Sequence, residues 1–220
     1  MNLYKLVSLS LIFSLLLFAG GYPQPKSFSH AQKIFKQIDL DYKMTAFSNK
    51  EYEYDPVTCM RKQYLKDEPG QEVVFVRIVP EELVAENLAC NTQDLCTNMR
   101  GKLYHGIKCC RKVDPLYKQY ERDIFNVMGI EKGTEYTNVT PPLHARGNIA
   151  RVYLYMKDEY KINLTKAQVK RYELWDKEDK VDEKECHIHE QISKIHSRSN
   201  PWIKSACETF LSKSSKSSQE

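Results

Sequence analysis

The chain has 220 residues, with 33 Lys and Arg against 29 Asp and Glu, so its formal net charge is only +4. This weak average field excludes a protein that attracts nucleic acid through its overall charge, and any attraction for phosphate has to come from local basic clusters. Roughly 200 residues without an internal repeat or a Gly/Ser linker can bury one substantial core. We therefore expect a single domain over residues 22–211, followed by a disordered polar tail at 212–220.

Residues 1–21 have the layout of a secretory signal peptide. Lys5 precedes the apolar stretch "LVSLSLIFSLLLFA", which is followed by small residues. The stretch is shorter than the roughly 20 residues of a membrane-spanning helix, which favours a cleaved signal over an uncleaved anchor. No second long apolar segment follows it. We expect a secreted or periplasmic protein with no membrane span after cleavage.

Seven cysteines follow the predicted signal peptide, and in an oxidising compartment such a set favours disulfide bonds. They are Cys59, Cys90, Cys96, Cys109, Cys110, Cys186 and Cys207. Zinc binding is the competing interpretation, but no Cys-x-x-Cys occurs, and two adjacent cysteines cannot easily place both sulfurs on one tetrahedral ion. The odd count leaves one thiol unpaired or in an intermolecular bond.

The first half of the chain has one helical pattern and then strand patterns. Residues 27–38 place four apolar side chains on one helical face after a serine cap. Residues 51–65 alternate aromatic and polar side chains, and "EVVFVRIV" at 72–79 is a β-branched run typical of a strand. Arg77 interrupts this run, and its simplest explanation is an edge strand whose guanidinium reaches water. The stretch between Cys90 and Cys110 is predicted to be an irregular, disulfide-bonded loop.

The second half is predicted to be mainly helical. Residues 114–129 start with Asp-Pro and end with Gly, and their apolar residues repeat at helical spacing, which predicts one helix. Helices are also predicted in residues 141–160, 164–179 and 181–198, the last ended by Ser-Asn-Pro at 199–201, and Thr165 and Gln168 of the second have the spacing of a capping box. The predicted fold class is α+β, with a small twisted sheet and a helical C-terminal half.

An ordered set of motifs runs through the last third of the chain. It comprises Arg146-Gly147-x-Ile149-Ala150-Arg151-x-Tyr153-x-Tyr155-Met156, Leu164-Thr165, Trp175-x-Lys177, Glu185-Cys186, Ile192-x-Lys194, Asn200-Pro201 and Ala206-Cys207. This order resembles the C-terminal half of the bacterial endonuclease I family, secreted or periplasmic non-specific nucleases of the ββα-metal type. The likeness extends to Cys96 and to Asp114-Pro115-x-Tyr117 with Glu121, Asp123 and Asn126. The resemblance implies an endonuclease I-like fold, DNA or RNA as the partner, and Mg²⁺ as the cofactor of an active member.

The resemblance also implies where the catalytic residues would lie. Phosphodiester cleavage needs a divalent ion at the scissile phosphate and a general base that activates water. The family places a metal-binding Glu and a His base directly before Val-Val-Pro, and these positions are Val76 and Arg77 here. Valine has no oxygen ligand for Mg²⁺, and a protonated arginine is not an ordinary general base. Two further family histidines are replaced, by Phe125 and by Ser199.

Other residues are candidates for replacement roles. His105 lies in the cysteine-bounded loop, and Glu135 lies near the place of the family's second metal-binding Asn, so both are rescue candidates for catalysis. Arg100 and Lys102 are possible counterparts of the family's phosphate-contacting arginine, which implies some affinity for nucleic acid. Three histidines of the last predicted helix are expected to be solvated surface side chains rather than metal ligands: His187, His189 and His196.

By the same resemblance, Cys186 should pair with Cys207, and Cys96 should pair with Cys109 or Cys110. The family's early Cys-Gly-Cys corresponds to residues 48–50, which hold no cysteine here. Cys59 therefore has Cys90 or the spare member of the adjacent pair as its possible partner.

Two sequons begin at Asn138 and Asn163, and they are glycosylation acceptors only in a host that has the machinery.

Three functions are compatible with these patterns. The favoured one is a secreted endonuclease I-like protein with a lost or remodelled nuclease site and residual nucleic-acid binding. The alternatives are an active Mg²⁺-dependent non-specific endonuclease with a rearranged site, and a secreted structural or effector protein without nucleic-acid contact. The first function predicts salt-dependent DNA binding without cleavage, the second predicts Mg²⁺-dependent nicking of DNA, and the third predicts neither. The sequence does not define the oligomeric state or a preference for DNA over RNA.

Overall fold

The structure, a computed structural model, describes residues 24–39, 42–54, 62–134 and 140–217, with side chains through Thr209. The expected signal peptide, Cys59, Glu135 and Asn138 lie outside the described residues. The elements are α2 (Phe28–Ile38), β1 (Tyr52–Tyr54), β2 (Gln63–Leu65), β3 (Glu72–Arg77), α3 (Glu81–Ala85), α4 (Ala89–Thr92), β4 (Cys96–Thr97), β5 (Leu103–Tyr104), α5 (Ile107–Val113), α6 (Pro115–Tyr120), η2 (Ile124–Asn126), β6 (Val127–Glu131), α7 (Leu143–Tyr160), α8 (Lys166–Glu178), α9 (Glu183–His196) and α10 (Pro201–Ser217).

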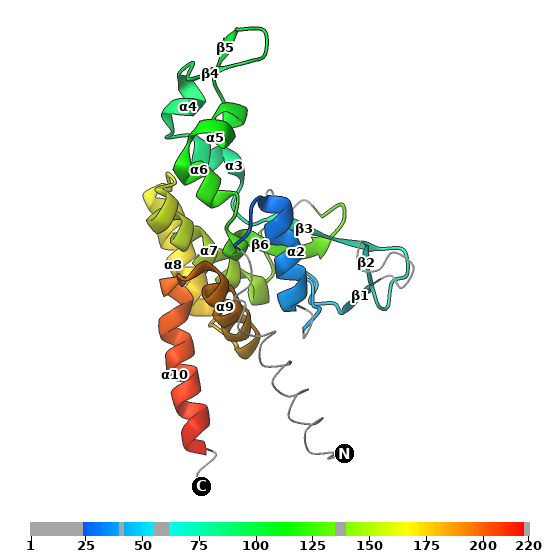
Figure 1. The fold of residues 1–220 in the computed structure, drawn as a ribbon. Helices are drawn as coiled ribbons and strands as arrows, with labels where there is room; N and C mark the ends of the chain where they lie inside the picture. The colour runs from blue at the N-terminus through cyan, green and yellow to red at the C-terminus, as the bar shows by residue number, and fades with distance from the viewer. Residues whose placement is uncertain (1–23, 40–41, 55–61, 135–139, 218–220) are drawn as a thin grey trace, which may run out of the picture.

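The main sheet has four antiparallel strands in the order β1-β2-β3-β6. Residues Val73 and Phe75 of β3 are buried on one face, where the Phe35 ring of α2 lies 5.9 Å from the Phe75 ring. Gly129 of β6 is the register partner of Phe75, and a Cβ atom added there would lie 3.2 Å from the Phe75 ring. The glycine therefore leaves room for the aromatic side chain, and α2 covers this part of the sheet (Figure 1).

The single helix predicted for residues 114–129 is wrong. The helix α6 ends at Tyr120, a short 3₁₀ turn follows, and Val127–Glu131 forms the strand β6 beside β3. The Asp123 side chain accepts a hydrogen bond from the Phe125 N–H at 3.0 Å, which fixes the turn. The apolar run of β6 then gives β3 a second neighbour, whereas a continued helix would leave that edge of β3 unpaired.

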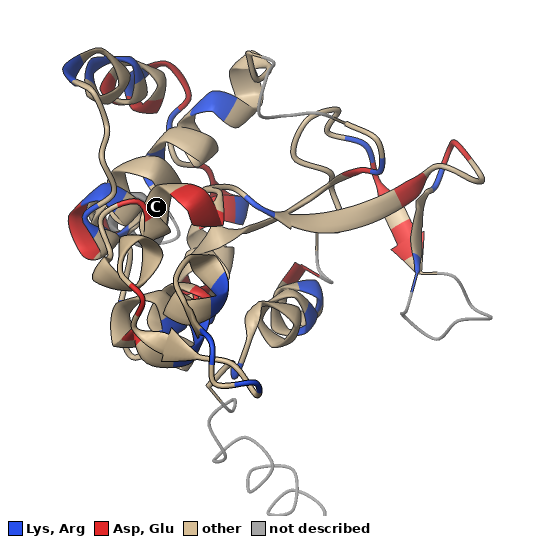
Figure 2. Ribbon diagram, turned by 90° about the horizontal axis from the view of Figure 1, so that it is seen from above, with Lys and Arg blue, Asp and Glu red and all other residues tan. Residues whose placement is uncertain are grey.

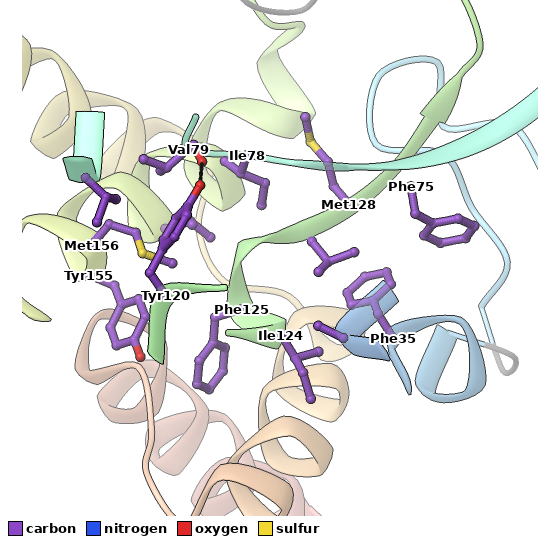
Figure 3. Packing of buried hydrophobic residues seen from close by; sticks show 14 of the residues in the cluster. Phe35, Phe75, Ile78, Val79, Tyr120, Ile124, Phe125, Met128, Tyr155 and Met156 are labelled. Carbon is purple, nitrogen blue, oxygen red and sulfur yellow. Dashed lines mark hydrogen bonds between the residues drawn. The ribbon is translucent and has the colours of Figure 1, made fainter. Parts of the chain in front are cut away.

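The helical C-terminal half packs against the sheet, as expected. Helices α7, α8 and α9 follow the predicted ranges closely, and the predicted capping box of Thr165 and Gln168 is present. One apolar core joins α2, the sheet, α6 and α7, and the Tyr120 hydroxyl within it donates to the Val79 carbonyl at 2.8 Å (Figure 3). The α+β fold class is confirmed.

Two residues of the Arg-Gly motif in α7 explain why the motif is needed for packing. The Arg151 side chain is fully buried and donates to both carboxylate oxygens of Glu185, at 2.7 and 2.6 Å. It also donates to Asp176 at 3.0 Å and to the Asp179 carbonyl at 2.7 Å. A Cβ atom on Gly147 would lie 1.9 Å from that same carbonyl oxygen. These motif residues therefore build the scaffold that joins α7, α8 and α9.

The described part of the chain contains three disulfide bonds: Cys90–Cys110, Cys96–Cys109 and Cys186–Cys207. The predicted pairing of Cys186 with Cys207 is confirmed. Cys96 pairs with Cys109, one of its two predicted partners. The suggested pairing of Cys59 with Cys90 or with the spare adjacent cysteine is wrong, because Cys90 and Cys110 pair with each other. Each closed loop stabilises the fold by about 2–4 kcal/mol relative to the reduced chain.

The disulfide-bonded segment and the C-terminal helix lie at opposite ends of the molecule (Figure 1). The β4–β5 hairpin forms the tip at one end, and α10 extends away at the other. Helix α10 continues through residues 212–217, which the sequence predicted to be a disordered tail. In the part of the chain that the structure describes, no helix has the length and apolar character required to cross a bilayer.

Candidate functional site

Arg77 lies at the end of an interior strand, and its guanidinium is largely enclosed. The strand β3 lies between β2 and β6, but β2 pairs only with the first two residues of β3, so at Arg77 the strand is paired on one side alone, with Val127 of β6. The expectation of a water-exposed guanidinium is wrong, because the side chain is largely enclosed by other elements. The side chain is 20% exposed, and its guanidinium carbon lies 3.8 Å from the centre of the Phe28 ring at the start of α2. The Tyr120 ring lies 5.6 Å from the same atom. An arginine over an aromatic face is stabilised by the ring's negative potential.

Arg77 belongs to a group of four alternating charges, which we call the ion-pair cluster: Arg77, Glu81, Arg111 and Glu121. Arg77 Nη2 lies 3.5 Å from Glu121 Oε1 and 3.9 Å from Glu81 Oε2. Arg111 lies across from it and donates from Nε to Glu121 at 2.7 Å and from Nη2 to Glu81 at 3.0 Å. Each carboxylate therefore lies between two guanidinium groups.

The elements around β3 position these four side chains. Pro80 ends the strand, and α3 starts at Glu81, which places this carboxylate four residues after Arg77. Arg111 comes from α5, and Glu121 directly follows α6. The hydrogen bond with Glu121 raises the pKa of Arg111, although partial burial opposes the shift. The cluster is electrically balanced, so it adds no net charge to this surface.

Tyr117 of α6 adds a hydrogen bond to the same cluster. Its hydroxyl donates to Glu81 Oε2 at 2.7 Å, and burial together with this carboxylate raises the pKa of the phenol. The tyrosine therefore stays protonated at neutral pH and acts as a donor. Asn126 fixes the neighbouring backbone, because its side chain accepts from the Val79 N–H at 2.7 Å and donates to the Val79 carbonyl at 3.0 Å.

The residues at the two implied catalytic positions do not fit a magnesium ion. Val76 is half-buried and has no donor atom, and Arg77 carries a positive charge that a cation would repel. The neighbouring carboxylates are already engaged by arginines. In the described ranges, no group of three or more His, Cys, Asp or Glu side chains is placed to hold a metal ion.

The two rescue candidates are not brought to the cluster by any described contact. His105 lies after β5 and is 56% exposed, and its Nδ1 is 2.8 Å from Asp94 Oδ1. Glu135 lies outside the described residues. A histidine held by a carboxylate has the arrangement of an oriented general base, since the carboxylate fixes the ring and favours one tautomer.

The sequence did not point to two members of the ion-pair cluster, Glu81 and Arg111. The spacing of Arg77 and Glu81 is i,i+4, which is a signal for pairing only when both residues lie on one helix. Here the strand ends between them, so the spacing alone could not reveal the contact. No sequence signal relates Arg111 to Glu81, its partner in the earlier part of the chain.

Arg100 and Lys102 lie in the loop of the β4–β5 hairpin, and both side chains are exposed. The loop is closed by Asn98, whose side-chain oxygen accepts from the backbone N–H groups of both residues at 2.9 and 3.0 Å. Residues 95–113 contain five Lys and Arg and no Asp or Glu. Figure 2 shows Lys and Arg interspersed with Asp and Glu over much of the molecule, and the lack of Asp and Glu in residues 95–113 makes this segment locally basic.

Two of the three histidines of α9, His189 and His196, differ from the expectation of solvated side chains, whereas His187 is partly exposed. His189 is 6% exposed, and its Nε2 accepts from the Asn200 N–H at 3.2 Å. His196 Nε2 accepts from the Ile124 N–H at 3.0 Å, and the Phe125 ring lies beside both imidazoles. Burial lowers the pKa of both histidines, which keeps them neutral and able to accept. They are structural residues of the core.

The fold and these motifs define a nuclease-like protein, and comparison with known families gives the family. The profile of the family described as Endonuclease I matches residues 99–207. An extracellular deoxyribonuclease of Aeromonas hydrophila is 41% identical over 71 residues, and a periplasmic deoxyribonuclease of that organism is 39% identical over 71 residues. Endonuclease-1 of Buchnera aphidicola subsp. Baizongia pistaciae is 39% identical over 70 residues. Residues 99–207 of this chain therefore belong to the endonuclease I family.

These matches cover part of each protein. Each pairwise match spans 32% of this chain and 31%, 30% and 29% of the respective relatives. The family match starts at Met99, so Val76 and Arg77 lie before it and their assignment to the metal-ligand and base positions stays a prediction. The extracellular and periplasmic relatives confirm the predicted secreted or periplasmic location.

Proposed function

We propose that this protein is an endonuclease I-like protein whose metal-and-base site is replaced by the ion-pair cluster, and that it retains affinity for nucleic acid. The observation that carries the proposal is the position of Arg77. At the place implied for the general base, a guanidinium is held between the Phe28 ring at 3.8 Å and Glu121 at 3.5 Å. A guanidinium stays protonated at any physiological pH, so it cannot accept a proton from water.

The surroundings of Arg77 also oppose conversion into a metal site. A divalent cation that bound Glu81 or Glu121 would have to displace arginine donors at 2.7 to 3.5 Å. It would then lie beside two guanidinium groups that each have lost one of their two carboxylate partners, and such a like-charge arrangement is unfavourable. The cluster therefore supports a structural role for the two carboxylates in this protein.

Nucleic-acid affinity is proposed for the basic segment that contains Arg100 and Lys102. Exposed cations next to a phosphate backbone release condensed counterions, so binding falls steeply as salt increases. The hydrogen-bonded turn holds the backbone of Arg100 and Lys102 in place, so binding has to order only their side chains. Such contacts are to phosphates and predict little preference for base sequence.

Two measurements on the folded, oxidised protein test the proposal. The first is binding of duplex DNA by fluorescence anisotropy between about 50 and 200 mM salt, where six or more phosphate contacts would weaken affinity about a thousandfold and two contacts far less. We expect the DNA affinity of the wild type to fall measurably but not steeply as salt increases. In the variant Arg100→Gln/Lys102→Gln this salt dependence should be smaller. A matched control, Lys166→Gln/Lys170→Gln on α8, should keep the salt dependence of the wild type. The absence of any DNA binding at low salt would contradict this half of the proposal and favour a protein without nucleic-acid contact.

The second measurement is plasmid incubation with Mg²⁺ or Mn²⁺. We expect no chelator-sensitive nicking. An active endonuclease with a rearranged site is the second candidate function, and the pairing of His105 with Asp94 at 2.8 Å is the observation that favours it. Nicking that is abolished by chelator and by His105→Ala would support this candidate and overturn our proposal. Glu135→Gln tests the other rescue residue in the same assay.

A further inference from the structure

Large apolar side chains that are exposed to solvent gather in the disulfide-bonded segment. Six such side chains occur in the described part of the chain, and four belong to residues 95–113. Met99 is fully exposed at the turn of the β4–β5 hairpin, Leu103 is 55% exposed and Leu95 is 52% exposed. We call these three residues the apolar tip. Exposed apolar side chains that cluster are a sign of an interaction surface, whereas single ones are ordinary.

The apolar tip is held in a fixed shape. Cys96 at the base of the hairpin is bonded to Cys109 of α5, and the short strands pair Thr97 with Leu103. Asn98 N–H donates to the Lys102 carbonyl at 2.9 Å, and the Asn98 side chain accepts from two backbone N–H groups of the turn. The loop therefore loses little conformational entropy when it binds, because it is already ordered.

Cations accompany the apolar tip, and carboxylates are missing from this segment. Arg100 and Lys102 lie between Met99 and Leu103 in the sequence, and Lys108 and Lys112 are exposed on the adjacent helix α5. No Asp or Glu occurs between residues 95 and 113, and the preceding Asp94 is paired with His105. The hairpin lies at the end of the molecule, away from α10, so a flat surface can approach it (Figure 1).

We propose that the β4–β5 hairpin docks on an anionic lipid bilayer. In this arrangement Met99, Leu103 and Leu95 enter the boundary between headgroups and acyl chains, and the neighbouring cations lie at the level of the anionic headgroups. A bilayer accepts separate apolar side chains without a complementary groove, and each nearby Lys or Arg strengthens binding to an anionic surface about fivefold. A nucleic-acid backbone would use the cations but would leave the apolar side chains in water. The apolar tip therefore favours lipid over nucleic acid, and this inference goes beyond the function proposed above.

The test places a reporter at the apolar tip of the full, oxidised protein. The two native tryptophans lie on α8 and α10, so Met99→Trp adds the only one on this segment. We expect its emission to shift to shorter wavelength with vesicles of phosphatidylglycerol and phosphatidylcholine, and to stay unchanged with phosphatidylcholine alone. In vesicle co-sedimentation, Met99→Ser/Leu103→Ser should weaken binding about tenfold or more. The matched control Leu174→Ser, at a side chain on α8 that is 53% exposed, should bind as the wild type does.

The other outcomes would overturn the inference. One is an absence of sedimentation with anionic vesicles at low salt. Another is equal binding by wild type and Met99→Ser/Leu103→Ser, which would mean that charge alone acts. A third is loss of duplex DNA binding in that variant with vesicle binding unchanged, which would identify the apolar tip as a wedge for nucleic acid. The DNA-binding measurement also separates this inference from the proposed function. If the proposed function holds, Arg100→Gln/Lys102→Gln weakens DNA binding even when the protein does not bind vesicles.

Discussion

The guanidinium of Arg77 lies 3.5 Å from the carboxylate of Glu121 and joins the end of a central strand to the end of helix α6. In the position implied for a general base, this side chain serves instead as a structural cation. The same carboxylate accepts a hydrogen bond from Arg111, so strand β3, helix α5 and helix α6 meet at Glu121.

Replacement of Arg77 by Met should reduce stability. The substitution removes the contact with the Phe28 ring and one cation of the ion-pair cluster, while the stem keeps much of its packing. We expect the free energy of unfolding to fall by about 1–2 kcal/mol, a value already reduced for partial solvent screening. Urea unfolding measures this change in the free energy of unfolding. Lys66→Met, which breaks an exposed pair with Glu51, is the control and should show no measurable change. An unchanged midpoint for Arg77→Met would show that the cluster does not stabilise the fold.

Asp123→Asn should be a strongly destabilising substitution. The Asp123 side chain is fully buried and accepts from Tyr155 at 2.9 Å, from Tyr160 at 2.6 Å and from Arg198 at 2.9 Å. The amide cannot accept at both oxygen positions and removes the charge that faces Arg198. We expect a loss of about 2–4 kcal/mol in denaturant unfolding. Asp67→Asn in an exposed turn is the control, and equal effects of the two substitutions would refute a central role for Asp123.

Gly147→Ala tests why the Arg-Gly motif contains glycine. The added methyl group would lie 1.9 Å from the Asp179 carbonyl and 2.7 Å from an Arg151 nitrogen. Helix α7 and helix α8 would have to separate locally, which we expect to cost about 1–3 kcal/mol despite the better helix propensity of alanine. Thermal unfolding measures the loss. Lys170→Ala, on the exposed face of α8, should not destabilise the protein, and a neutral Gly147→Ala would mean that the helices are not tightly packed here.

The buried histidines predict a loss of stability at acidic pH. Burial holds the pKa of His189 and His196 below 6.5, so the folded protein binds their protons less readily than the unfolded chain does. The nearby carboxylate of Asp123 favours the charged form of His196, and Arg198 opposes it. The full stability is present above about pH 6.5 and is lost as the pH falls below it, by up to about 1.4 kcal/mol per pH unit for each histidine.

Urea unfolding at about pH 7.5 and pH 5.5 checks this prediction. His196→Asn should lower stability at the higher pH and should lose less than the wild type on acidification. His144→Asn, at an exposed position of α7, should leave the pH dependence unchanged. A pH dependence in His196→Asn as large as that of the wild type would assign the effect to other groups.

Local patterns predicted most of the helices but only part of the sheet. Residues 27–38, 141–160 and 164–179 carry an apolar period or a cap that fixes a helix without reference to the rest of the chain. The strand β6 was predicted as helix because Ile124 and Val127 are three residues apart, and because its pairing with β3 joins residues about 50 positions apart. A strand partner that is so distant in the sequence produces no local sequence pattern.

The candidate site was predictable in part. The resemblance drew attention to Val76 and Arg77, and the family's last two cysteines gave the Cys186–Cys207 bond, which the structure confirms. The contacts of Arg77 with Phe28 and Glu121 depend on three elements that are distant in sequence, so spacing could not show them. The burial of His189 and His196 was missed for the same reason, since their backbone partners lie on other segments.

The central claim is that an ion-pair cluster stands where the family's metal-and-base chemistry would be. The most direct test is a plasmid-nicking time course with the purified, oxidised wild-type protein in Mg²⁺ or Mn²⁺, each with and without chelator. A preparation of Arg77→Met carried through the same purification serves as the reference for contaminating nuclease. We predict that supercoiled plasmid persists equally in all samples. Chelator-sensitive nicking by the wild type that exceeds the reference and disappears in His105→Ala would contradict the claim.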